Sequence, residues 1–157
     1  MMLKKVLEEY YNFHKELIIW IRREKMMKIN TELSDIHYRC HIPASTVCHH
    51  KGLGVVIGSG VKLGENVHIY QNVTLGSRGG GAEGFPVIDD NVIIFAGASV
   101  LGGVKVGHDS IIGAYSLVLN DIPPHSVAFG IPAKIVKEDN KNRLKEKKWK
   151  RNFLMLL

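Results

Sequence analysis

The stretch IGSGVKLGENVHIYQNVTLG, residues 57–76, has an aliphatic residue at every sixth position, and the spacing resumes after one interruption and continues to residue 118. The positions of this first series are Ile57, Leu63, Ile69, Leu75, Ile88, Ile94, Val100, Val106, Ile112 and Val118. A second series of small or β-branched residues lies four positions after members of the first: Val61, Val67, Val73, Val92, Ala98, Val104, Ser110 and Ser116. An α-helix repeats every 3.6 residues and a simple strand every two, so neither explains a period of six.

A fixed six-residue repeat predicts a parallel β-helix. Each hexapeptide forms one short strand and a turn, and three of them make a coil of about eighteen residues. Strands of adjacent coils are then about 4.8 Å apart, and the aliphatic side chains stack inside. We therefore expect the first-series side chains to be almost completely buried. The register gives a little over three coils, with an incomplete one before Ile57 and the last one ending at Leu119.

The repeat is interrupted between Leu75 and Ile88, which are thirteen positions apart where one side of a coil needs six. The interruption reads GSRGGGAEGFP, residues 76–86. About seven residues must therefore leave the coil as a loop. Glycines allow a backbone to approach a ligand closely, so we expect this loop to be functional rather than a neutral insertion.

The flanking segments suggest three parts: an N-terminal helical segment over residues 1–30, the β-helix over 31–136, and a basic tail over 137–157 that we also expect to be helical. The net charge is +6, and residues 137–151 contain eight Lys or Arg against three acids. The repeat has no basic stripe, so nucleic acid is not an expected partner, and membrane contact is not expected either. No secretory signal begins the chain, so we expect a cytoplasmic protein in which Cys40 and Cys48 are free thiols.

The candidate chemistry lies in CHHKGLGVVIG, residues 48–58, because the sequence has no phosphate loop, dinucleotide fingerprint or nucleophile elbow. A neutral imidazole of His49 or His50 could take the proton of a hydroxyl group that attacks an acyl group. The N–H groups of nearby glycines could hold the oxyanion that develops. A histidine in a turn is also compatible with an ordinary surface position, and the spacing alone leaves this open.

From about residue 41 to residue 137 the chain resembles the hexapeptide-repeat acyltransferases, and among them the serine acetyltransferase family and its relatives that acetylate sugars. Three stretches carry the resemblance: IPAS at 42–45, HKGLGVVIGSGVKLGENVHIYQNVTLG at 50–76, and AGASVLGGVKVGHDSIIGAYSLVLNDIPPHSVAFGIPAKIVK at 96–137. The combination of VTLG with the GIPAK ending is specific to this branch of β-helices.

The resemblance implies a left-handed parallel β-helix that forms homotrimers, with acetyl-CoA as co-substrate in a groove between two subunits. The acetyl group would pass directly to the acceptor, without an acyl-enzyme and without a metal. His50 matches the general base of the family, and His49 takes that place if the alignment shifts by one. The positions that match CoA-contacting residues are Gly76, Ala96, Ala114, Gly130 and Lys134.

Three departures from the family pattern bear on the acceptor. Phe85 precedes Pro86 where serine acetyltransferases carry a second active-site histidine. Cys40 stands where the family has an aspartate that orients the base, although Asp35 or Glu32 could substitute. The chain also shows no counterpart of the long N-terminal helical domain, and it is a few residues short before His50. These departures favour a hydroxyl of a sugar or glycan precursor as acceptor, with serine as the alternative.

Two further interpretations belong to other functional classes. One is a non-catalytic, trimeric β-helix scaffold. The other is a β-helix of the carbonic anhydrase type, which needs three metal-binding histidines on neighbouring coils. His68 and His108 lie on coil sides, but no third histidine has a matching register, so we expect no metal site.

Overall fold

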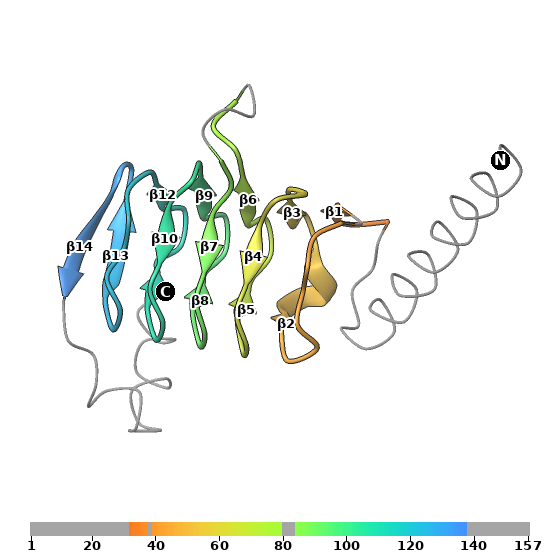
Figure 1. The fold of residues 1–157 in the computed structure, drawn as a ribbon, viewed down its shortest axis with the longest axis horizontal. Coiled ribbons are helices and arrows are strands. Elements are labelled where there is room, and N and C mark those ends of the chain that lie inside the picture. Colours follow the sequence, from red (N-terminus) through yellow and green to blue (C-terminus); the bar gives the residue numbers. More distant parts are fainter. Residues whose placement is uncertain (1–31, 38, 80–83, 138–157) are drawn as a thin grey trace, which may run out of the picture.

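The protein is described by a computed structural model over residues 32–37, 39–79 and 84–137, and these residues form a parallel β-helix whose short strands stack along one axis (Figure 1). The predicted fold class is thereby confirmed as a parallel β-solenoid, while its left hand stays an expectation. The helices expected within residues 1–30 and 138–157 lie outside the described residues. Within the described ranges, no helix is long and apolar enough to cross a membrane.

Three sheets form the sides of the coil, which we call sides A, B and C. Side A contains β1 (Asp35–Ile36), β3 (Val56–Ile57), β6 (Thr74–Gly76), β9 (Ser99–Leu101) and β12 (Leu117–Val118), paired in that order. Side B contains β4 (Lys62–Leu63), β7 (Val87–Ile88) and β10 (Lys105–Val106). Side C contains β2 (Val47–Cys48), β5 (His68–Ile69), β8 (Ile93–Ile94), β11 (Ile111–Ile112), β13 (Val127–Gly130) and β14 (Ala133–Lys137).

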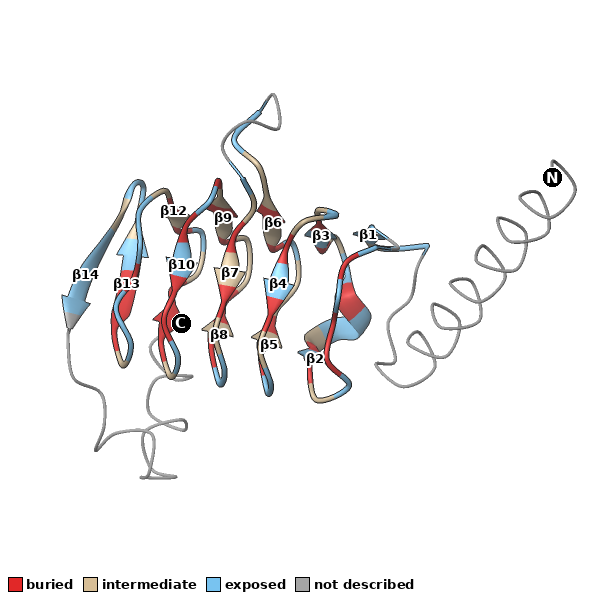
Figure 2. Ribbon diagram, in the orientation of Figure 1, coloured by how far each residue is buried: buried red, intermediate tan, exposed pale blue. Residues whose placement is uncertain are grey.

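The core is the column of aliphatic side chains inside the coils, and Figure 2 shows buried positions recurring along every side. All ten first-series residues are buried, and the most exposed of them, Leu63, is 6% exposed. All eight second-series residues are buried as well, including Ser110 and Ser116. The inward register expected from the hexapeptide repeat is therefore confirmed throughout.

The irregular segment before Ile57 supplies one short piece to each side of a first coil. Strand β1 pairs with β3 on side A, and β2 pairs with β5 on side C. Between them, His41 forms an isolated parallel bridge with Lys62 on side B. The expectation that a less regular coil precedes the repeat is confirmed.

The loop between β6 and β7 has the expected size. Ten residues, 77–86, separate these strands, whereas three residues, 102–104, make the equivalent connection from β9 to β10. The difference is the seven residues that the spacing predicts. After the loop, the ring of Phe85 packs on the turn that follows β3, so closely that a Cβ atom on Gly58 would lie 2.7 Å from it.

The coil continues further than the sequence analysis expects. Ile122 is buried and bridges Val106, and β13 pairs in parallel with β11. Strand β14 then pairs antiparallel with β13 at the end of the solenoid. The prediction that the last coil ends at Leu119 is therefore wrong. The corner from side A to side B is two residues shorter here, because Ile122 follows Val118 by four positions, and this hides the continuation of the repeat.

Candidate active site

The strand register of side C aligns most of the predicted site residues along one edge of the solenoid. In this sheet Cys48, Ile69, Ile94, Ile112 and Ala128 are paired in succession. The residues two positions after these, where the chain turns from side C toward side A, are His50, Gln71, Ala96, Ala114 and Gly130. We call this row the C/A edge. It brings the predicted base into line with three of the five predicted CoA-contacting residues.

His49 is held in place by aromatic neighbours from the next coil. Its ring stacks on Tyr70 with 4.0 Å between centroids and 16° between planes, and Tyr70 in turn lies 4.9 Å from Phe95. On another side, Nε2 of His49 is 3.1 Å from Nδ1 of His68, at hydrogen-bonding distance. One ring nitrogen of His49 is therefore engaged by another histidine, and stacking fixes the plane of the ring.

His50 has a different environment in the same turn. Strand β2 leads into a short 3₁₀ turn, η1 (His49–Gly52), in which His50, Lys51 and Gly52 all have positive φ. The other coil turns place single residues in this conformation, and three in succession occur only here among the described residues. His50 is exposed, and its side chain makes no hydrogen bond within the described ranges. Its imidazole is thus open to a substrate.

The charge states around this turn follow from burial. Burial, and after it the neighbouring His50 charge, lower the pKa of His49 below its ordinary value of 6.5. Burial also raises the pKa of the Cys48 thiol to about 11. Cys40 is buried too, and its thiol donates to the carbonyl oxygen of Val61 at 3.5 Å. Both cysteines are free, as predicted, and neither one is placed to act as a thiolate nucleophile.

Cys40 stands at the position of the family's orienting aspartate, and its side chain points into the coil. Its side chain belongs to the hydrophobic core of the coil, so it does not replace an orienting aspartate. Asp35 is exposed in β1, on side A. The side chains that contact His49 are Tyr70, which stacks on its ring, and His68, which lies on a coil side and was not predicted to have a role.

The glycine N–H groups after the histidines are not all available for an oxyanion. The Gly54 N–H donates to the carbonyl oxygen of Leu33 at 2.6 Å. The next N–H group, of Val55, donates to the carbonyl oxygen of Gly52 at 3.0 Å. Gly54 therefore does not provide the oxyanion donor that the glycine pattern suggested.

Gly76 does not lie on the C/A edge. It ends β6 at the opposite end of side A, where the long loop begins, and its carbonyl oxygen accepts a hydrogen bond from the Gly102 N–H at 2.9 Å. A Cβ atom on Gly76 would have no neighbour within 4 Å, so the backbone here is open to a ligand. Within one chain, the structure places Gly76 and the histidines at two different corners of the coil.

A groove lies beside the base of this loop, and the sequence analysis missed the residue that spans it. Arg78 donates from Nε to the carbonyl oxygen of Leu101 at 3.4 Å and from its guanidinium to the carbonyl oxygen of Leu119. The groove has a volume of about 440 Å³ and is lined by Arg78, Gly102, Gly103, Val104, Leu119, Asn120 and Asp121. Arg78 is the only basic residue of the interruption, which is the signal that could have identified it.

Lys134 lies at the C-terminal end of the C/A edge. Its strand, β14, turns back on β13, and the register pairs Lys134 with Phe129 and Ala133 with Gly130. Lys134 is exposed, so its ammonium group is accessible beside the last member of the edge. A single cation at this place suits a phosphate group.

Comparisons with known proteins agree with this architecture. Residues 85–120 match the family model described as Bacterial transferase hexapeptide (six repeats). The serine acetyltransferase of Staphylococcus xylosus is 50% identical over 91 residues, which cover 57% of this chain and 42% of that protein. The serine acetyltransferase of Buchnera aphidicola is 41% identical over 127 residues, covering 77% of this chain and 48% of the relative.

Solved structures with a similar fold are also serine acetyltransferases. The serine acetyltransferase of Neisseria gonorrhoeae in complex with serine is 34% identical with a TM-score of 0.64, over 79% of this chain and 50% of that one. The enzyme of Brucella abortus in complex with coenzyme A is 36% identical with a TM-score of 0.64, over 67% and 42%. The chain spans about half the length of the relatives it matches. Its β-helix is therefore similar, in sequence and in fold, to that of the serine acetyltransferases among the hexapeptide-repeat transferases.

Proposed function

We propose that this protein is an acetyl-CoA-dependent O-acetyltransferase and that serine is its acceptor. The observation that carries the proposal is the C/A edge, because it aligns an accessible histidine with three positions that match CoA contacts. The similarity to serine acetyltransferases, two of them solved with serine or with coenzyme A, supports the choice of both substrates.

His50 is the proposed general base. His49 has Nε2 engaged by His68, whereas the exposed ring of His50 is available to a hydroxyl group. The imidazole takes the hydroxyl proton as the oxygen attacks the thioester carbonyl carbon. The tetrahedral intermediate then expels the CoA thiolate, which receives the proton from the imidazolium. The products are the acetate ester and free CoA thiol, and no group of the protein is acetylated.

Acetyl-CoA would extend along the C/A edge from the histidines toward Lys134. Ala96 and Ala114 are small residues on this row, which leaves room for an extended ligand. Lys134 at the far end would meet phosphate groups of the nucleotide. This direction places the thioester near His50 and the charged end of the co-substrate near the end of the solenoid.

A homotrimer would complete the site. Gly76 and Arg78 lie at the other corner of side A from His50, so one chain alone cannot bring them to the same ligand. Three-sided coils packed about a threefold axis place unlike corners of neighbouring copies against each other. In this arrangement one copy supplies the histidine turn and its neighbour supplies Gly76 and the loop.

A sugar hydroxyl is the second candidate acceptor, and Phe85 is the observation that favours it. Its ring is packed on the Gly58–Gly60 turn, against the core of the coil. An aromatic ring at this place offers no charge to the carboxylate of an amino acid, and a neutral sugar acceptor has no carboxylate that would need one. The comparisons support serine more strongly than this alternative.

The test is release of free CoA thiol by the purified full chain with acetyl-CoA and either L-serine or a panel of sugars. Serine-dependent release is the expected result, and His50→Ala is the matched negative control. Release with sugars alone would replace serine by the second candidate. If no hydroxyl acceptor raises thiol release above the rate with acetyl-CoA alone, the protein is a β-helix without this activity and the proposal is wrong.

A further inference from the structure

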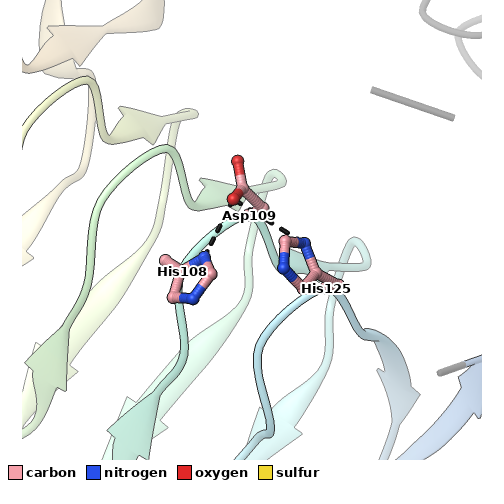
Figure 3. Close-up of side chains that lie close together, drawn as sticks. All are labelled: His108, Asp109 and His125. Carbon is pink, nitrogen blue, oxygen red and sulfur yellow. Dashed lines mark hydrogen bonds and ion pairs between the residues drawn. The ribbon is translucent and has the colours of Figure 1, made fainter. Parts of the chain in front are cut away.

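The turns that lead from side B to side C in the last two coils bring together His108, Asp109 and His125, a cluster that the proposed transfer does not use (Figure 3). His108 and Asp109 follow β10, and His125 occupies the corresponding turn one coil later. One ligand atom from each residue, an imidazole nitrogen or a carboxylate oxygen, lies within 4.8 Å of the other two. The hexapeptide spacing did not indicate this cluster, because the predicted repeat ends at Leu119, before His125.

The geometry fits a small cation with nitrogen and oxygen ligands. Oδ2 of Asp109 is 2.9 Å from Nδ1 of His108 and 3.7 Å from Nδ1 of His125. A tetrahedral zinc ion with bonds of about 2.0–2.1 Å separates its ligands by about 3.3 Å. The two histidine rings are nearly perpendicular, with centroids 4.7 Å apart, so neither ring lies flat over the other.

A second observation, on the imidazole of His125, supports a cation at this place. Nδ1 of His125 is buried, yet it has no hydrogen-bond partner among the residues that the structure describes. A buried polar atom without a partner costs free energy, and a bound cation in front of it would remove that cost. Oδ2 of Asp109 is 3.7 Å from this nitrogen. That distance is too long for a hydrogen bond, but it suits two ligands of one metal ion.

Backbone hydrogen bonds hold the two turns against each other and against the coil before, which preorganises the three side chains. Asp109 and His125 both adopt φ of 58°, and the His125 N–H donates to the carbonyl oxygen of His108 at 2.9 Å. The Asp109 N–H donates to the carbonyl oxygen of Asp90 at 3.0 Å, which ties the site to the coil before. The turns also touch at Gly107, where a Cβ atom would lie 2.5 Å from the nitrogen of Pro124.

We infer that His108, Asp109 and His125 bind a divalent transition metal of the zinc class. Two imidazoles and one carboxylate are ligands that suit zinc, and three protein ligands leave one position for water. The ion would join the turns of two successive coils near the C-terminal end of the solenoid. Its expected effect is on the stability of this end, and the acetyl transfer proposed above does not depend on it.

The test is calorimetric titration of untagged, chelator-treated full-length protein with zinc chloride. The expected result is one zinc ion per chain and an increase in the thermal unfolding midpoint on binding. Cobalt should bind at the same place and give the visible absorption of a four-coordinate ion. Asp109→Asn and His125→Asn are the test variants, because asparagine tolerates the positive φ of both positions.

Each variant should fold, with an unfolding midpoint near that of the metal-free wild type, and should lose at least about tenfold in zinc affinity. His41→Ala is the matched control for loss of an exposed histidine. His49→Gln is the control for the pair formed by His49 and His68. Both controls should bind zinc as the wild type does. Absence of zinc binding by the wild type, or equal affinity after His125→Asn, would overturn the proposal. Loss of binding in His49→Gln would place the ion at the other pair and overturn it as well.

Discussion

His49 and His68 face each other across two successive coils, with Nε2 of the first 3.1 Å from Nδ1 of the second. The contact exists because β2 and β5 are paired with Val47 opposite His68, and His49 follows Val47 by two residues, directly after the end of β2. Tyr70, from the same coil as His68, stacks on the face of the His49 ring. His49 is therefore held by two neighbours, whereas His50 beside it is exposed, which is why His50 is the residue that we propose as general base.

The lowered pKa of His49 predicts a dependence of stability on pH. In the folded protein His49 takes up its proton at a lower pH than in the unfolded chain, where the ordinary value is 6.5. Below about pH 6.5 the unfolded chain thus binds more protons, and this residue's contribution to the free energy of unfolding falls as the pH falls. When the pH is lowered from 8 to 5, the thermal unfolding midpoint should decrease more steeply in the wild type than in His49→Gln. Parallel curves for the two proteins would contradict this assignment.

The inward register predicts a large difference between two neighbouring residues of β3. Ile57 is 1% exposed and belongs to the core, whereas Val56 is 37% exposed. Ile57→Ala should lower the free energy of unfolding by about 2–5 kcal/mol, because it leaves a cavity in a packed column. Val56→Ala, the matched control, should change it by about 0.5 kcal/mol or less. Urea denaturation measures both, and equal losses would show that the register is wrong.

Ser110 provides a prediction that the repeat alone does not make. It occupies a second-series position where most coils have a β-branched or small apolar residue, so the pattern suggests that Ser110→Val would be tolerated. In the structure its hydroxyl donates to the carbonyl oxygen of Pro123 at 2.9 Å and accepts from the Ser126 N–H at 3.3 Å.

Ser110→Val should therefore lower the free energy of unfolding by about 1–3 kcal/mol, because the buried Ser126 N–H and the carbonyl oxygen of Pro123 both lose a hydrogen bond. Urea denaturation is again the measurement. Ser99→Val, at a half-buried position of β9, is a control in which such a loss is not expected. A Ser110→Val protein as stable as the wild type would show that the hydroxyl is dispensable.

The proposed trimer predicts the mass in solution. Light scattering coupled to size-exclusion chromatography at micromolar concentration should give three times the chain mass of 17.5 kDa. A second test mixes His50→Ala with Arg78→Ala protein after dissociation and reassociation. If the site combines the histidine turn of one copy with the loop of another, mixed trimers should recover part of the activity. A monomer in the first experiment would remove the inter-subunit site.

The hexapeptide spacing was sufficient to predict the coil from Ile57 to Val118, because every inward position carries an apolar or small residue. It was also sufficient to give the length of the excluded loop. The spacing failed after Val118, where a shortened corner moves Ile122 out of phase and the antiparallel β14 follows no repeat. A periodic pattern identifies core side chains only where the spacing is regular, so it did not identify Ile122, which is buried but out of phase.

The candidate site was predictable only in part for the same reason. His50, Ala96, Ala114 and Gly130 follow from the resemblance, and the strand register brings them into one row. The partner of His49 could not be predicted, because His68 lies nineteen residues away and the contact depends on the pairing of β2 with β5. The cluster of His108 with His125 likewise depends on a turn beyond the regular repeat.

The proposed role of His50 as general base is tested by thiol release by His50→Ala at saturating acetyl-CoA and serine. Removal of a general base costs about 10²- to 10⁴-fold in rate, so turnover should fall by that factor. Calorimetric binding of acetyl-CoA should stay as in the wild type, because its proposed contacts lie further along the C/A edge. His49→Gln should keep most of the turnover, since its role is in the packing of the turn. Wild-type turnover in His50→Ala, with or without a loss in His49→Gln, would contradict the account.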